Sequence, residues 1–220
     1  MIFEALAARF VALRGGSNQI VARATHQQSL AMAQVEPQNF EMTRAGRRMW
    51  LGNSAAVTGI APVQAIPTTA AQWAIYNADP TATYFFEELG AFLTSGTPGL
   101  GGSLWACVFD APAEVGSNAA GLTVDSLSHG GRTSKAIVKS GVTITTPAAP
   151  IWFPLVQNQE NITAAAFSSG FGMTFERRDL AGAIAVQPGK SLGLAVMGPT
   201  GTTPLFAPFA RWIEQETDME

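Results

Sequence analysis

The triplet Gly189-Lys190-Ser191 has the residue types that close a phosphate-binding loop, so nucleotide binding is the first chemistry to consider. The complete loop needs glycine at position 184, because successive backbone N–H groups must curl around the phosphates before a helix begins. Ile184 occupies that position, and residues 192–196 alternate with the period of a strand. Pro188-Gly189 suits the centre of a type II turn. The triplet is therefore predicted to lie in a hairpin that binds no nucleotide.

The segment "VDSLSHGG" brings together Asp125, Ser126, Ser128 and His129, the residue types of a nucleophile, a base and an orienting acid. A strand places positions 125, 127 and 129 on one face and positions 126 and 128 on the other, so these side chains do not all converge. The segment is predicted to be a polar strand end that leads into a glycine turn. A triad assembled from distant segments stays open as the alternative.

The pair Glu87-Glu88 has the carboxylates that glycoside hydrolysis requires. Adjacent residues of a regular strand point to opposite faces, and two such carboxylates cannot flank one bond. One is expected to face solvent or an interface, and the other to pair with an arginine. Arg177-Arg178 is interpreted as the charged end of a strand, with pairing across an interface as the alternative.

Metal and cofactor chemistry has few candidate ligands in this sequence. The chain has two histidines, His26 and His129, and one cysteine, Cys107, which is too few for a zinc cluster. Cys107 lies in "SLWACVFD", which indicates a small buried residue on a strand. We predict no catalytic, cofactor or metal site, and therefore a protein that is not an enzyme.

The composition favours assembly with other chains. Charged residues make up 13% of the sequence and hydrophobic residues 47%, which argues against disorder and suggests that other chains cover part of the surface. Residues 1–48 carry six Arg against three Glu, a net charge of +3, and the remainder has a net charge of −6. A +3 arm is suited to an acidic protein surface but is too weak to predict nucleic-acid binding. No apolar run has the length of a membrane span, and the first sixteen residues lack the features of a secretory signal.

The N-terminus is predicted to be a short amphipathic helix that ends at Gly15-Gly16, followed by an extended arm to residue 46. Apolar residues recur at helical spacing, and two arginines accompany them. The predicted interface residues are Ile2, Phe3, Leu6, Phe10, Leu13, Arg9 and Arg14. Such a helix is marginal alone in water, so its apolar stripe is expected to pack against a partner.

From Arg47 onward, short apolar or alternating runs are separated by Gly, Pro, Asn and Asp, which predicts a body of antiparallel strands over residues 47–220. The predicted strands are 47–53, 56–64, 71–77, 83–94, 103–110, 121–127, 134–139, 141–146, 150–156, 165–176, 180–187, 191–197 and 204–215. This number of strands is too large for one sheet, so two sheets packed as a β-sandwich are expected.

The five tryptophans are candidates for stacking on sugar rings, as in a carbohydrate-binding module. Four of them, Trp50, Trp73, Trp105 and Trp152, lie in apolar runs and are predicted to be core. Trp212, close to the acidic C-terminal residues, is expected near the surface.

The chain as a whole resembles capsid-associated structural proteins of tailed bacteriophages, of the decoration or cement type. The resemblance covers most of residues 47–216, through the Ala, Thr and Gly-rich strands of "MWLGNSAAVTGIAPVQAIPTTAAQWAIYNADP" and the Pro-Gly hairpin of "VQPGKSLGLAVMGPTG". It implies a mainly β, antiparallel sandwich with a jelly-roll-like body, commonly a homotrimer, that stabilises the head without catalysis. The expected partners are the major capsid protein or another virion protein, and the expected location is the virion, assembled in the bacterial host cytoplasm. A tail, neck or fibre-associated component and a carbohydrate-binding sandwich are the alternatives.

Overall fold

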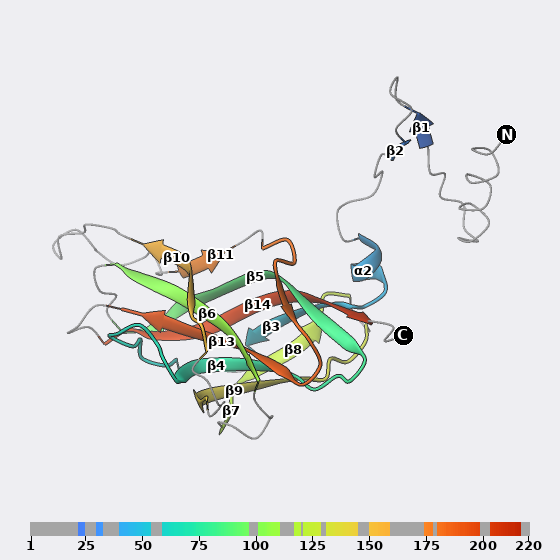
Figure 1. Cartoon of the computed structure of the whole chain (residues 1–220). Helices are drawn as coiled ribbons and strands as arrows, with labels where there is room; N and C mark the ends of the chain where they lie inside the picture. Colours follow the sequence, from blue (N-terminus) through green and yellow to red (C-terminus); the bar gives the residue numbers. More distant parts are fainter. Residues whose placement is uncertain are drawn as a thin grey trace. The chain divides into compact units, whose positions relative to one another are not determined.

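The computed structural model of the chain describes residues 22–24, 30–32, 40–53, 59–96, 101–110, 117–119, 121–128, 131–144, 150–158, 174–177, 180–198 and 203–216. The chain divides into two compact units, residues 1–40 and residues 41–220. In the first unit, β1 (Ala22–Ala24) pairs antiparallel with β2 (Leu30–Met32), as Figure 1 shows. The predicted N-terminal helix and its seven interface residues lie outside the described residues.

The second unit is built almost entirely of strands. Its helix is α2 (Phe40–Arg44), a short turn that leads into the first strand. The strands are β3 (Arg48–Asn53), β4 (Ala70–Asn77), β5 (Ala82–Ser95), β6 (Gly102–Asp110), β7 (Ser117–Asn118), β8 (Leu122–Ser126), β9 (Ala136–Thr143), β10 (Phe153–Asn158), β11 (Thr174–Arg177), β12 (Ile184–Val186), β13 (Lys190–Met197) and β14 (Leu205–Glu216). Within the described ranges, no helix is long and apolar enough to cross a membrane.

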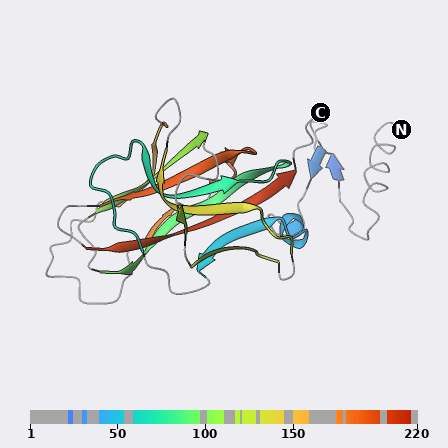
Figure 2. The same ribbon diagram turned by 90° about the horizontal axis from the view of Figure 1, so that it is seen from below.

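These strands form two six-stranded antiparallel sheets. One sheet has the order β10-β6-β13-β4-β9-β7, and the other has the order β11-β5-β14-β3-β8, with β12 also paired to β5. Figure 2 shows β3, β5 and β14 in one layer and β4, β6 and β13 in the other. The prediction of a mainly β, sandwich-like body with two antiparallel sheets is confirmed.

The main core lies between the sheets, because both contribute buried side chains to one cluster. Its largest members include Trp212, Phe86, Leu104 and Leu194. Strand β14 alternates buried and less buried positions from Phe209 to Glu214, as expected for a strand with one face on a core. A smaller apolar cluster lies on the opposite face of the β4-containing sheet: Ala71, Ala74, Cys107, Phe109, Val142 and Ile144, with Trp152 packed against them.

Residues 59–63 connect one sheet to the other, and we call this segment the strap. Ile60 exchanges two backbone hydrogen bonds with Phe206 of β14, at N···O distances of 2.8 and 3.0 Å. Val63 donates to the carbonyl of Val196 and accepts from the N–H of Gly198, each at 2.9 Å. The strap therefore ties the start of β14 to the end of β13.

Some strand predictions are wrong. The part of residues 56–64 that is described forms only the two isolated bridges of the strap. Residues 134–139 and 141–146 were expected as two strands, but β9 runs through Gly141 without a break. Gly141 adopts a φ of 61° there, which glycine tolerates inside a strand.

Candidate interaction surface

The outer face of the sheet that contains β3, β5 and β14 carries an open groove of about 320 Å³, which we call the outer groove. Its side chains come from all three strands and from Leu127, just after β8. Those that define its chemistry are Trp50, Glu88, Phe92, Leu127, Phe209 and Arg211. Strand alternation explains the first of them: Met49 and Leu51 are buried in the core, so Trp50 between them points outward.

Trp50 lies flat over its own strand. A β-carbon added to Gly52 would stand 2.5 Å from Cζ3 and 2.7 Å from Cη2 of the Trp50 indole. The ring therefore occupies the space that a side chain at position 52 would take. Trp50 keeps 43% of its surface exposed in this position. One ring face is thus supported by backbone while the residue stays accessible from solvent.

A β-bulge places two carboxylates on this outer face. In the β5–β14 ladder, Arg211 pairs with Glu88 and Trp212 with Phe86, so Glu87 is the extra residue. Phe86 and Leu89 on either side both point into the core. The expectation that Glu87 and Glu88 point to opposite faces is therefore wrong.

Each carboxylate of the bulge forms an ion pair with an arginine. The Nε atom of Arg48 lies 2.7 Å from Oε2 of Glu87, and Nη2 of Arg211 lies 2.5 Å from Oε2 of Glu88. Both glutamates are largely buried, and Arg211 is about half exposed. The Glu88–Arg211 pair lies in the outer groove, where it presents acceptor and donor atoms beside the aromatic rings.

The remaining walls of the outer groove are apolar. Phe92 of β5 and Phe209 of β14 pack with ring centroids 6.4 Å apart at an interplanar angle of 36°. Leu127, just after β8, is 40% exposed. The groove therefore combines a flat indole, an apolar wall and one ion pair.

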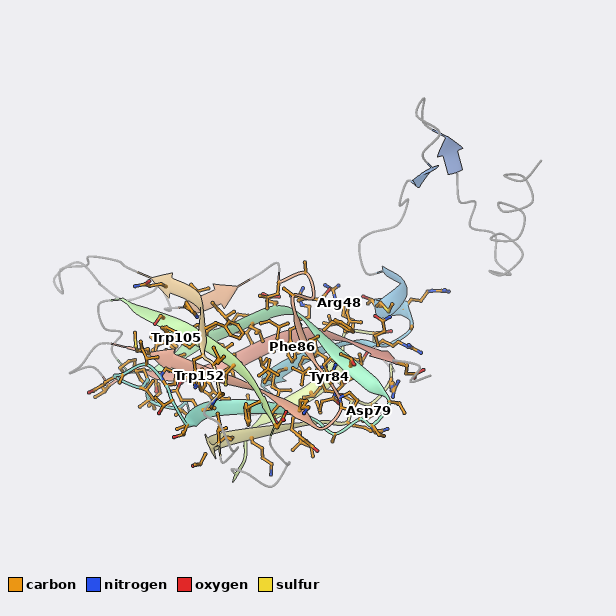
Figure 3. All side chains as sticks on the ribbon, viewed as in Figure 1. Arg48, Asp79, Tyr84, Phe86, Trp105 and Trp152 are labelled. Carbon is orange, nitrogen blue, oxygen red and sulfur yellow. The ribbon has the colours of Figure 1, made fainter. Side chains whose placement is uncertain are left out.

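A second polar site lies at one end of the sandwich, and we call it the buried polar cluster: Asp79, Tyr84, Arg132, Ser134 and Glu214. Figure 3 shows Asp79 at that end and Tyr84 nearer the middle. Asp79 is fully buried and accepts hydrogen bonds from the N–H and Oγ1 of Thr81, at 3.0 and 2.9 Å. Its other oxygen lies 2.8 Å from Nη2 of Arg132.

The carboxyl groups of this cluster have opposite pKa shifts. Burial by itself would raise the pKa of Asp79, but the hydrogen bonds from Thr81 and the nearby ammonium of Lys135 outweigh burial and lower it below 3.8. Burial raises the pKa of Glu214 above 4.5, and the hydrogen bonds from Ser134 and Trp212 offset this only in part. The pKa of Asp79 is thus lowered by its partners, whereas the pKa of Glu214 is raised by burial.

The nucleotide-loop triplet lies in the predicted tight turn, but the turn does not close a hairpin, because β12 pairs with β5 in one sheet and β13 pairs with β4 and β6 in the other. The N–H of Lys190 donates to the carbonyl of Gln187 at 3.1 Å, and Gly189 between them has a φ of 74°. Pro188 and Gly189 therefore occupy the centre of a type II turn. Ser191 is buried in β13, and Lys190 pairs with Asp110 at 2.5 Å.

The other candidate residues have structural roles where they are described. Asp125 accepts a hydrogen bond from the N–H of Ser126, and Oγ of Ser126 reaches the carbonyl of Gly46 at 3.3 Å. His129 lies outside the described residues. Cys107 is buried on β6 as predicted, and burial raises the pKa of its thiol to about 12. Among the described side chains, no three His, Cys, Asp or Glu gather as metal ligands do.

Three of the tryptophan predictions are wrong: those for Trp212, for Trp50 and for Trp105, which is only partly buried and belongs to neither apolar cluster. Trp212 is fully buried against Tyr84 and Phe86, with ring centroids 6.0 and 5.6 Å apart. Trp50, predicted to be core, is exposed. The signal that could have revealed Trp50 is Gly52, two positions later on the same face of the strand. Arg177 ends β11, and Arg178 lies outside the described residues.

Comparison of the chain with protein-family models, curated proteins and solved structures gives no match.

Proposed function

We propose that this chain is a non-enzymatic virion structural protein, a decoration, cement or minor capsid protein that stabilises a phage head through protein–protein contacts. The order of its strands is the observation that carries this proposal. Number the strands β3, β4, β5, β6, β10, β12, β13 and β14 from one to eight in chain order. One sheet then has the order 1-8-3-6 and the other 2-7-4-5. This order supports a jelly roll, an architecture that viral capsid domains use.

The strands outside this set support an elaborated jelly roll. Strands β7, β8 and β9 follow the fourth strand, and they extend both sheets at one side. In the extension, β8 pairs with β3 and β9 pairs with β4. The insertion therefore widens the sandwich and leaves the arrangement of the eight strands unchanged.

Exposed apolar side chains support assembly with other chains. Ile151 is 86% exposed and Ile66 is 57% exposed, and both lie outside the two sheets. Large apolar side chains gain free energy when a partner covers them, by about 25 cal/mol for each Å² of apolar surface. Few charges compete with such contacts, since charged residues make up only 13% of the chain. We propose a homotrimer that contacts the major capsid protein or another virion protein.

The test is to bind the purified full chain to heads of its parent phage that lack it and to locate it by electron cryo-microscopy. Density on the outer or inner head shell supports the proposal, and density confined to tail, neck or fibres overturns it in favour of those sites. In light scattering at micromolar concentration, the isolated chain should have about three times its monomer mass of 23.1 kDa.

The docking role of residues 1–46 is tested with matched double variants. Phe3→Ala with Phe10→Ala should weaken attachment to heads more than Arg9→Ala with Arg14→Ala, because apolar burial contributes more than a few screened charges. Deletion of residues 1–45 should leave a cooperatively melting body that no longer joins the particle. Full occupancy by the deleted chain would show that the body itself docks.

A further inference from the structure

We propose that the outer groove is a carbohydrate-binding site that stacks one pyranose ring on Trp50 and hydrogen-bonds its hydroxyls through Glu88 and Arg211. This inference does not depend on the virion role. It rests on the juxtaposition of a flat exposed indole, a carboxylate and a guanidinium in one groove.

The first step is the stacking platform. The C–H groups on one face of a pyranose ring are weakly positive, and the face of an indole is negative, so the two attract in addition to their apolar contact. Trp50 lies against the backbone at Gly52, which leaves the ring no room to rotate toward the sheet. A platform that is already held in place loses little conformational entropy when a ligand binds.

The second step is the hydrogen bonding. Each sugar hydroxyl is both a donor and an acceptor. The Glu88 carboxylate is an acceptor in the lining of the groove, 2.5 Å from Nη2 of Arg211, and the guanidinium of Arg211 has five N–H donors on a half-exposed side chain. Adjacent hydroxyls on one ring edge can donate to the carboxylate and accept from the guanidinium. Hydrogen bonds to charged groups are the stronger kind.

The ion pair also decides between a sugar and the other ligand classes. An apolar segment laid over the groove would remove water from Glu88 and Arg211 without returning hydrogen bonds, which is costly for charged groups. The guanidinium that could bind a phosphate, that of Arg211, is already paired with Glu88 in the same groove, and this carboxylate repels a second anion. A neutral polyhydroxylated ring meets neither penalty.

The size and walls of the groove are consistent with a short stretch of oligosaccharide. Its volume of about 320 Å³ is at the lower end of the range for small-molecule sites. Phe92, Phe209 and Leu127 extend the apolar surface beyond Trp50. They would contact a second ring while the first ring lies on the indole.

The experiment titrates the full chain with four soluble hexasaccharides, built of β-linked glucose, α-linked glucose, β-linked N-acetylglucosamine and α-linked galacturonate. The readout is the Trp50 indole N–H resonance in NMR, which is identified by its absence in Trp50→Phe. At least one neutral hexasaccharide should shift this resonance saturably. Trp50→Ala should raise the Kd, measured by calorimetry, at least about tenfold. Glu88→Gln should raise it severalfold.

The matched control is Ile151→Ala, which removes an exposed apolar side chain next to β10 of the other sheet and should leave the Kd unchanged. Thermal melting of every variant separates a lost site from a lost fold. The proposal is overturned if no neutral hexasaccharide shifts the resonance at about 10 mM, or if Trp50→Ala, still folded, binds as the parent does. It is also overturned if Trp50→Ala only dissociates an oligomer in light scattering and no sugar binds, because the groove would then be a contact between copies.

Discussion

Tyr84 and Glu214 face each other across the β5–β14 ladder, and each has a buried oxygen that lacks a hydrogen-bond partner among the described residues. The hydroxyl of Ser134 donates to the other oxygen of Glu214, Oε1. Burial, reinforced by the nearby Glu214, raises the pKa of Tyr84. The inter-sheet core therefore contains two polar groups that reduce its stability.

Glu214 should make stability fall as pH rises. Its pKa is raised in the folded chain, so folding is favoured while the group is protonated, and this contribution is lost from pH 4.5 upward through the folded pKa. Glu214→Gln stays neutral and should melt at a higher temperature than the parent at pH 8, with a smaller difference at pH 5. The control is Glu216→Gln, which alters an exposed carboxylate two positions along the same strand. Equal pH slopes for the parent and Glu214→Gln would contradict this prediction.

Tyr84→Phe should leave the free energy of unfolding unchanged or raise it by up to about 1 kcal/mol, because it removes an unsatisfied buried hydroxyl and keeps the ring. Urea denaturation followed by circular dichroism measures this difference. Tyr76→Phe, on the neighbouring sheet and only partly buried, is the comparison. A loss greater than about 1 kcal/mol would mean that the Tyr84 hydroxyl has a partner in solution.

Arg132 and Lys135 should contribute unequally, although both reach Asp79. Arg132→Met leaves the buried carboxylate without its closer partner and should cost about 3 kcal/mol in urea denaturation. Lys135→Met removes a half-exposed ammonium 3.3 Å away and should cost about 1 kcal/mol or less. Adding Asp79→Asn to Arg132→Met should recover part of the loss. If both single variants lose the same stability, the burial argument is wrong.

Lys190→Ala should be nearly neutral, because Lys190 makes an exposed pair with Asp110, worth about 1 kcal/mol at most. ATP or GTP at millimolar concentration should not change the melting temperature of the parent or of the variant. A rise of several degrees with nucleotide would show that the native chain binds it, since ligands stabilise the state to which they bind.

The tight turn at residues 187–190 was predictable because its determinants are local, whereas the pairing of its flanking strands with different sheets was not. Proline fixes one backbone angle and glycine permits a positive φ, so Pro188-Gly189 specifies the turn without any tertiary contact. The buried position of Cys107 was also predictable from local sequence, because the apolar residues around it indicate a buried strand. The two-sheet architecture followed from the number and spacing of such local patterns.

The outer groove was not predictable from the sequence because it depends on the relation between strands. The bulge at Glu87 exists only in the register of β5 against β14, and it reverses the face assigned to each residue beyond it. Trp212 is close to acidic residues in the sequence, yet β14 continues past it and its alternation turns Trp212 inward. The acidic residues that follow Trp212 in the sequence therefore gave a wrong prediction. The alternation of inward and outward side chains along β14 gives the right one.

The strap has a mechanical consequence for the body. Two layers that touch only through side chains can slide past each other under load, because apolar contacts resist sliding weakly and without direction. The four backbone hydrogen bonds of Ile60 and Val63 join β14 to β13 near the same end. A force that pulls one layer along the other must break both hydrogen bonds of Ile60 or both hydrogen bonds of Val63, so the strap acts as a shear clamp for the sandwich.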